Sequence, residues 1–290
     1  MENLKSFQPT LKSEKVVNNI CFVRQLNLEK SKRKTQFQKN CYILQSMVKK
    51  NFKAQYRNSF LGVLWTVLNP LLNMIVLALV FSQLFGQRAG VGIYPVYLFC
   101  ANLMFNMMRQ ITTQSLSCIV SNSGLIKKVK ISYSIFPISN MFTALVNFCV
   151  SFVALIVVML IVKQQFYWTI LLTITIVPAV LLFSLGIGFV LASLYVFFRD
   201  VKHLYDVFLT LWMYLTPIFY TAETLKRAKA VAIINMNPMT HFIKAFRGII
   251  QWGTVPTGKE YLICYAWAIG MFIVGYSIFK LNQKKYILYI

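Results

Sequence analysis

Long uncharged stretches, mostly apolar, alternate with short clusters of basic residues along most of the chain. Thirty uncharged residues separate Arg57 from Arg88, and thirty-two separate Lys130 from Lys163. A bilayer core needs about 20 apolar residues in a helix, and unpaired backbone groups are costly in lipid. The pattern therefore predicts membrane-spanning helices, and we place six of them near 61–86, 92–117, 133–162, 168–198, 204–221 and 261–281.

Three segments flank these spans. Residues 1–35 form a polar, basic extension. Residues 36–60 predict an amphipathic helix in the cytosolic interface, with Met47 and Phe52 on its apolar face and lysines mostly elsewhere. A basic stop before the first span is the simpler interpretation, and the two are compatible. Residues 282–290 are expected to form a cytoplasmic tail.

The segment between the fifth and sixth spans, 222–260, is unusually apolar for a loop. Asn237-Pro238 interrupts it, because proline lacks a backbone donor and restricts the residue before it. Thr216-Pro217 places a second break at the end of the fifth span. Two short apolar pieces around a break predict a re-entrant helical pair, which is stable at membrane depth when protein surrounds it.

Composition supports a membrane protein. Hydrophobic residues make up 58% of the 290 residues and charged residues 13%, about half the charged fraction of soluble domains. The basic residues that give the chain its net charge of +23 cluster between apolar stretches. We therefore attribute this charge to membrane topology and not to nucleic-acid binding. Twenty-one Lys and Arg fall on one side of the predicted spans and eight on the other. By the positive-inside rule, this predicts that both termini lie in the cytoplasm. Together with the helical spans, the expected fold class is an all-α integral membrane protein.

Few residues offer catalytic chemistry. The cysteines show no CxxC pair, and we expect no metal site. Residues 253–259 match the first seven positions of a phosphate-binding loop, but Glu260 stands where Ser or Thr must hold Mg²⁺. The predicted spans contain no Asp or Glu apart from Asp206. This disfavours both an ion-gradient carrier and a membrane enzyme with paired carboxylates.

Several polar residues nevertheless lie inside the predicted spans. Asn102, Asn106, Arg109 and Thr113 share one helical face of the second span. Asn69 and Asn73 do the same on the first span. Either set could form interhelical hydrogen bonds or a wet surface that contacts sugars. An intramembrane cation such as Arg109 favours the functional interpretation.

Small residues at four-residue spacing mark the fourth span. Ser184, Gly188 and Ala192 lie on one face of that helix and predict a close contact with another helix.

Three stretches in order resemble a known family. They are residues 57–65 (RNSFLGVLW) leading to Asn69-Pro70, residues 121–128 (SNSGLIKK), and residues 197–201 (FFRDV) leading to residues 214–218 (YLTPI), Asn237-Pro238 and Arg247. Across about 40–285 the chain resembles the permease subunits of type-2 ABC transporters that export lipid-linked polysaccharides such as O-antigen, capsule and wall teichoic acid.

This resemblance implies roles for individual residues. The predicted ATPase-coupling residues are Ser123, Gly124, Leu125, Ile126, Lys127 and Lys128. Lys53, Arg57, Arg199 and Asp200 are expected at the cytosolic interface, the last two as a salt-bridged pair or a second contact. The predicted translocation path comprises Asn69, Asn73, Asn102, Asn106, Arg109, Tyr214, Pro217, Asn237 and Pro238.

The resemblance also implies partners. A separate ABC ATPase would bind ATP and Mg²⁺, so this chain would be a transport subunit and no enzyme, with no cofactor of its own. Two copies would form the pore in the bacterial plasma membrane, among membrane lipids, for a lipid-linked glycan. The alternative is a type-2 permease for a drug or small lipid. No nucleic acid is expected.

Overall fold

The computed structural model describes residues 36–55, 93–128, 131–220 and 234–289, together with positions 65, 68, 71, 72, 75, 76, 80 and 232. The chain divides into two compact units, residues 1–43 and 44–290. The described part of the first unit is the beginning of helix α2 (Gln36–Gln55). The remaining helices belong to the second unit, which also includes residues 44–55 of α2.

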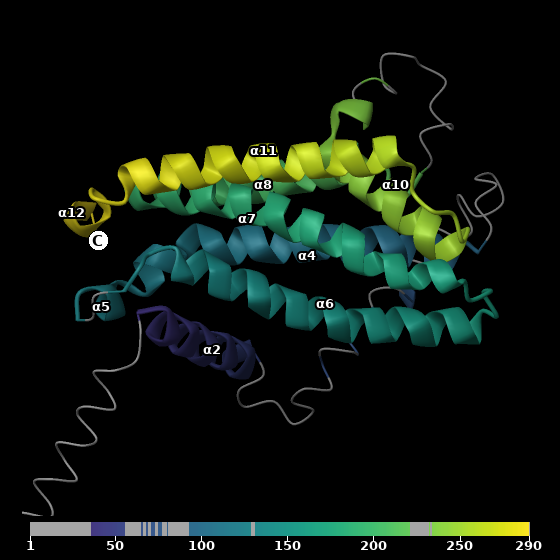
Figure 1. Ribbon diagram of the computed structural model, residues 1–290, viewed down its shortest axis with the longest axis horizontal. Helices are drawn as coiled ribbons and strands as arrows, with labels where there is room; N and C mark the ends of the chain where they lie inside the picture. Colours follow the sequence, from purple (N-terminus) through teal and green to yellow (C-terminus); the bar gives the residue numbers. More distant parts are fainter. Residues whose placement is uncertain are drawn as a thin grey trace, which may run out of the picture. The chain divides into compact units, whose positions relative to one another are not determined.

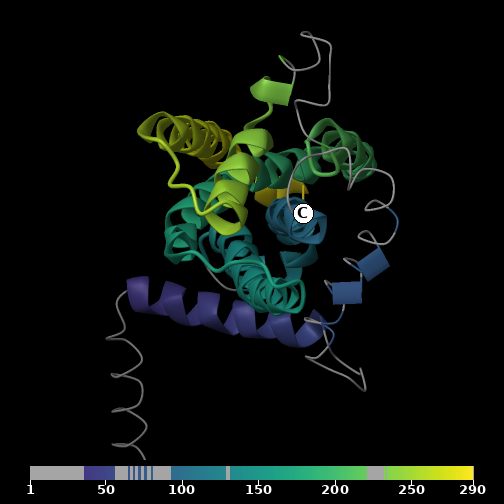
Figure 2. The ribbon, with the colours of Figure 1, turned by 90° about the vertical axis from the view of Figure 1, so that its right-hand side faces the viewer.

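The second unit is a bundle of long helices (Figure 1). The residues that the structure describes form helices and no strand, which confirms the all-helical part of the predicted fold class, while the six spans and the orientation of the termini stay predictions. α7 packs against α4, α6 and α11, as the view along the helices shows (Figure 2). The helices of the bundle are α4 (Tyr94–Ser121), α5 (Ser123–Ile126), α6 (Ile135–Ile161), η1 (Trp168–Leu172), α7 (Thr173–Phe197), α8 (Val201–Leu215), α10 (Pro238–Gln251), α11 (Gly258–Asn282) and α12 (Tyr286–Tyr289).

Three described stretches are long and apolar enough to cross a bilayer: α6, η1 with α7, and α11. Helix α4 occupies the range expected for the second span, but polar residues lower its hydropathy. Helix α8 ends at Leu215, earlier than the predicted 204–221, because the chain leaves the helix before Pro217. Most of the predicted first span and the extension 1–35 lie outside the described residues.

Small residues let α7 approach its neighbours closely. Ser184, Gly188 and Ala192 are all buried, and a Cβ on Gly188 would meet Ser115 of α4. The predicted close contact is therefore confirmed. A tighter contact joins Gly186 of α7 to Gly275 of α11. A Cβ on Gly275 would overlap the backbone carbonyl of Gly186. Glycines at both positions bring the two helix backbones together.

Residues 216–220 leave α8 as a non-helical segment, and four of their carbonyl oxygens accept hydrogen bonds from side chains. Arg247 of α10 donates from Nη1 to the Pro217 carbonyl at 2.8 Å and from Nη2 to the Ile218 carbonyl at 2.9 Å. Tyr94 and Tyr97 of α4 donate to the next two carbonyls, at 2.8 and 3.0 Å. We call this arrangement the carbonyl cradle.

Arg247 is the centre of the carbonyl cradle. Its side chain is 4% exposed, and Nε donates to the backbone carbonyl of Tyr97 at 3.1 Å. Its guanidinium carbon lies 3.4 Å from the centroid of the Tyr97 ring. A buried charge is costly unless it is hydrogen-bonded, and here three carbonyls and an aromatic face surround it.

The ends of α10 are also capped. Asn237 accepts from the Met239 amide at 3.0 Å and from Trp212 Nε1 at 2.9 Å, and donates to Thr216 Oγ1 at 2.8 Å. At the other end, Thr169 Oγ1 donates to the Ile249 carbonyl at 2.7 Å. Helix ends otherwise leave backbone groups unpaired, so these contacts allow α10 to lie buried in the bundle.

Gly275→Ala is expected to destabilise the bundle, because the new methyl group meets the Gly186 backbone, which has no rotamer to change. Overpacking of this kind costs about 1–3 kcal/mol. The melting temperature of the purified protein in detergent should fall. Gly270→Ala on the same helix is the control, since no atom lies within 4 Å of the new Cβ. Equal melting temperatures for the two variants would contradict the close contact.

Arg247→Lys is expected to lower the melting temperature as well. A lysine ammonium is a single point of charge and cannot span the three carbonyls that the guanidinium fork reaches. Each buried carbonyl left unpaired costs about 1–3 kcal/mol. Arg199→Lys, at an exposed position, should melt like the unmodified protein. If Arg247→Lys melts at the same temperature as this control, the carbonyl cradle does not stabilise the non-helical segment 216–220.

Candidate functional site

One side of α4 is polar along most of its length. The exposed or half-exposed residues on this side, which we call the polar face of α4, are Asn102, Asn106, Arg109, Gln110, Thr113, Gln114 and Ser117. The structure thus brings together Asn102, Asn106 and Arg109, three residues of the predicted path. Asn106 donates to the Asn102 side chain at 3.1 Å, so these two amides are oriented by each other.

The outward faces of α6 and α11 are mostly apolar. The large hydrophobic residues exposed on α6 are Phe142, Val146, Val153, Val157, Leu160 and Ile161. Those exposed on α11 are Leu262, Ile263, Trp267, Ile269, Ile273, Val274, Tyr276 and Leu281. Such surfaces suit contact with lipid chains, whereas the polar face of α4 does not, because polar groups lose hydrogen bonds in hydrocarbon. The bundle therefore has chemically different sides.

Arg109 differs from Arg247 in its surroundings. It is exposed, and within the part of the chain that the structure describes its guanidinium makes no hydrogen bond or salt bridge. Its backbone carbonyl accepts from Thr112 Oγ1 at 3.0 Å and from Thr113 Oγ1 at 2.7 Å. The charge is thus presented outward from a helix whose other outward residues are neutral.

A cavity of about 900 Å³ lies beside the carboxyl end of α8. Its polar groups are largely engaged within the protein: Trp212 donates to Asn237, and Tyr220 donates to the Tyr214 carbonyl. The cavity therefore presents a mainly apolar surface. Its lining residues are Phe208, Leu211, Trp212, Tyr214, Leu215, Tyr220, Ile234, Met236, Asn237 and Pro238.

The predicted path residues thus fall into separate places. Tyr214, Asn237 and Pro238 line the cavity. Pro217 is buried, with its carbonyl bound to Arg247 in the carbonyl cradle. Asn69 and Asn73 lie outside the described residues.

The predicted coupling residues lie at one end of the bundle, where α5 follows α4. In α5, Ile126 is buried and anchors the turn, while Gly124 and Leu125 are exposed. Lys127 and Lys128 follow and are also exposed. Figure 1 shows α12 at the same end. This end thus exposes a short apolar and basic segment, with Ile126 buried beneath it.

Ring contacts order the same end of the bundle. The rings of Tyr133 and Tyr286 meet edge to face, with centroids 5.8 Å apart, which ties the segment after α5 to α12.

The expected cytosolic interface residues are placed in part. Arg199 and Asp200 are exposed in the turn between α7 and α8. Arg199 donates to the Tyr289 carbonyl at 3.3 Å and lies over the Tyr195 ring. No salt bridge joins it to Asp200 among the described residues, so the structure does not show the pair as salt-bridged. Lys53 lies in the last turns of α2, and Arg57 is outside the described residues.

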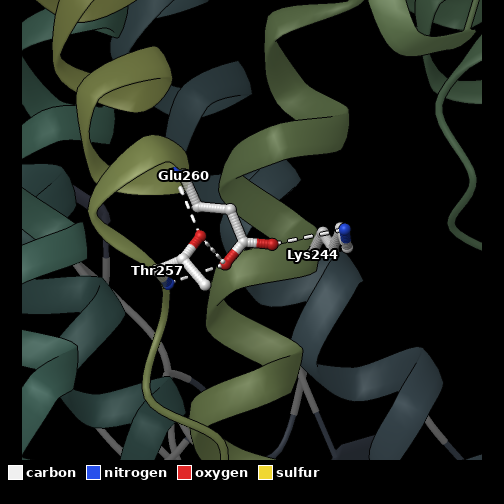
Figure 3. Close-up of polar contacts among 3 residues, drawn as sticks. All are labelled: Lys244, Thr257 and Glu260. Carbon is white, nitrogen blue, oxygen red and sulfur yellow. Dashed lines mark hydrogen bonds and ion pairs between the residues drawn. The ribbon is translucent and has the colours of Figure 1, made fainter.

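The stretch that resembled a phosphate-binding loop is a helix cap (Figure 3). Thr257 is the N-cap of α11, and its backbone amide donates to Glu260 Oε2 at 3.0 Å while the Glu260 amide donates to Thr257 Oγ1 at 3.4 Å. Lys244 of α10 forms a salt bridge with Glu260 at 3.2 Å. Glu260 is therefore explained as a capping-box residue.

Among the described residues, no three His, Cys, Asp or Glu side chains gather as a metal site would require.

Sequence reasoning missed the roles of Tyr94 and Tyr97. The signal was indirect: a break at Thr216-Pro217 frees carbonyls that need donors, and both tyrosines lie at the start of a neighbouring helix. Arg247 was noticed as part of a motif, without a structural role.

Comparison with known proteins gives consistent matches. A permease named O-antigen export system permease protein RfbA from Myxococcus xanthus is 29% identical over 245 residues, covering 84% of this chain and 94% of that protein. A protein of the same name from Klebsiella pneumoniae is 30% identical over 250 residues, covering 84% and 92%. A second from Klebsiella pneumoniae is 27% identical over 247 residues with the same coverage.

The family model described as ABC-2 type transporter matches residues 42–250. This region includes α4, α6, α7, α8 and most of α10, and so both the polar face of α4 and the carbonyl cradle. Because the match covers more than half of the chain, the chain belongs to the ABC-2 type transporter family.

Proposed function

We propose that the chain is the permease subunit of an ATP-driven exporter that moves a lipid-linked polysaccharide from the cytoplasmic side across the bacterial plasma membrane. One observation carries this proposal: three relatives named as O-antigen export permeases match 84% of the chain and at least 92% of their own length. The similarity therefore includes the helices that bear the polar face of α4 and the cavity beside α8.

The proposed topology has six spans and both termini in the cytoplasm. Its support is the distribution of charge along the bundle. Lys127, Lys128, Lys202, Lys284 and Lys285 lie in or next to the turns at the α5 and α12 end. The described turns at the opposite end carry fewer basic residues. Basic residues favour the cytoplasmic side, so the α5 end is proposed to face the cytoplasm.

The energy for transport is proposed to come from a separate ABC ATPase, which binds ATP and Mg²⁺. The stretch around Gly253 that most resembled a nucleotide site is a helix cap. Helix α5 with Lys127 and Lys128 is the proposed docking element, because its Gly124 and Leu125 and the two lysines are exposed at one end of the bundle while Ile126 is buried. The turns of α2 near Lys53 are proposed as a second contact.

A second copy of the chain is proposed to complete the pore. Helix α8 buries Tyr205 and Leu209 but exposes a broad apolar face, with Leu204 at 70% and Leu211 at 65%. A second copy would cover this surface and bring two polar faces of α4 to one path. Asn69 and Asn73 would extend that path along the first span.

Depletion of the protein tests the proposed cargo. Depleted bacteria should lose surface polysaccharide and accumulate lipid-linked polymer inside, because polymer synthesis continues while export stops. The measurement is immunoblotting of surface and cytoplasmic polymer. Normal surface polysaccharide would refute the proposal and favour the alternative of a permease for a drug or small lipid.

The ATPase assignment has its own test. The chain purified alone should lack ATPase activity, and the chain purified from its native cells should carry a nucleotide-binding subunit with it.

Charge reversal at α5 tests the docking element. Lys127→Glu with Lys128→Glu should weaken co-purification of the ATPase by roughly tenfold, equivalent to about 1.4 kcal/mol. The matched control is Lys163→Glu with Lys259→Glu, which reverses two exposed charges at the opposite end of the bundle. Equal ATPase recovery from both double variants would show that α5 is not the docking element.

A further inference from the structure

The polar face of α4 extends from Asn102 to Ser117, about 22 Å at 1.5 Å per residue. That is most of the roughly 30 Å thickness of a bilayer core. The exposed side chains of α6 and α11 are large and apolar over comparable lengths. Asn106 bonds the Asn102 side chain and Thr113 bonds the Arg109 carbonyl, but lipid would leave the remaining hydrogen-bonding groups of this face, the Arg109 guanidinium above all, without partners. The face therefore needs a polar neighbour.

The side chains of this face match hydroxyl groups. Four are amides, which both donate and accept, and two carry hydroxyls. Amides and hydroxyls can exchange hydrogen bonds with successive sugars without holding any one of them strongly. The neutral positions of the polar face are Asn102, Asn106, Gln110, Thr113, Gln114 and Ser117.

Arg109 is the exception on this face. A guanidinium has five donors, no acceptor and a permanent charge, so its complement is an anion. The sequence contains no Asp or Glu between Glu29 and Asp200, so α4, α6 and α7 supply none. Asp206 lies on α8, which packs against α4, but no salt bridge joins it to Arg109 in the described structure.

Arg247 shows how the same bundle treats a structural cation. Three backbone carbonyls and the Tyr97 ring surround it, and it is buried. Among the described residues Arg109 has none of these contacts, and it is exposed. An intramembrane cation without such contacts typically marks a substrate path.

We propose that Arg109 binds a phosphate group of the exported molecule, and that the polar face of α4 is the surface along which its hydroxyl-rich chain moves. This inference rests on the proposed function. A single cation among six neutral polar residues fits an anion that occurs once per molecule, such as the phosphate that joins a glycan to its lipid. A polymer charged at every repeat would need further cations along the face.

Thiol labelling tests whether the face meets water. The full complex in membranes carries Asn106→Cys and is treated with a charged, water-soluble thiol reagent, and labelled peptides are quantified by mass spectrometry. The native Cys149, exposed on α6 beside its apolar residues, is the internal control. Asn106→Cys should react at least about tenfold faster, because the reactive thiolate forms in water. Equal or slower labelling would mean that lipid or a second copy covers the face, and would overturn the inference.

Binding of matched lipids tests the charge. The purified complex is titrated with a polyisoprenyl diphosphate and with the uncharged polyisoprenol of the same length. Arg109→Gln should weaken diphosphate binding about tenfold or more and leave polyisoprenol binding unchanged, since a charge-assisted hydrogen bond is lost. Arg109→Lys should retain part of the preference. Lys163→Gln, an exposed cation in the turn after α6, should bind both lipids like the unmodified complex.

The outcomes separate this inference from the proposed function. If Arg109→Gln binds both lipids like the unmodified complex, or weakens both equally, the phosphate role fails whatever depletion shows. If depletion leaves surface polysaccharide intact while the labelling and binding results are as expected, the proposed cargo fails and the phosphate site stands.

Discussion

The carbonyl cradle is the constraint on which the rest of the bundle depends. Pro217 ends α8 inside the protein and leaves the carbonyl oxygens of residues 217–220 without helical partners. Arg247, Tyr94 and Tyr97 supply donors to all four. Because these donors come from α10 and α4, satisfying the broken backbone also fixes three elements relative to one another. The chain can therefore leave its helix among apolar neighbours without unpaired backbone groups.

The position of the segment 216–220 also determines where the cavity beside α8 and the polar face of α4 lie. Asn237 joins the start of α10 to Trp212 and Thr216, which places the apolar cavity at the end of α8. Helix α4 gives its tyrosines to the carbonyl cradle and keeps its amides and Arg109 on the outside. One helix thus anchors the fold on one side and presents the polar face on another. The proposed path for a lipid-linked polysaccharide, with its polar chain and apolar tail, needs both kinds of surface.

Much of the fold could be predicted from the sequence because the physical signals were local. Charge-free lengths near that of a bilayer predicted helices that the structure shows at α4, α6, α7 and α11, and the small residues around Gly188 predicted a close contact. Asn102, Asn106 and Arg109 were placed on one face by helical periodicity alone. The predicted fifth span ended at residue 221, whereas α8 ends at Leu215. The prediction was wrong there because apolar residues continue past Leu215 while the helix stops before Pro217.

The sequence by itself determined the class of protein, the approximate helices and the polar pattern of α4, because these depend on composition and on spacing along one helix. Only the tertiary structure decided which arginine is structural. Helical spacing puts Arg109 among polar residues and Arg247 among mostly apolar ones, but it does not show what either guanidinium contacts. Their difference arises because backbone carbonyls of residues 97, 217 and 218, far apart in sequence, converge on Arg247 and not on Arg109.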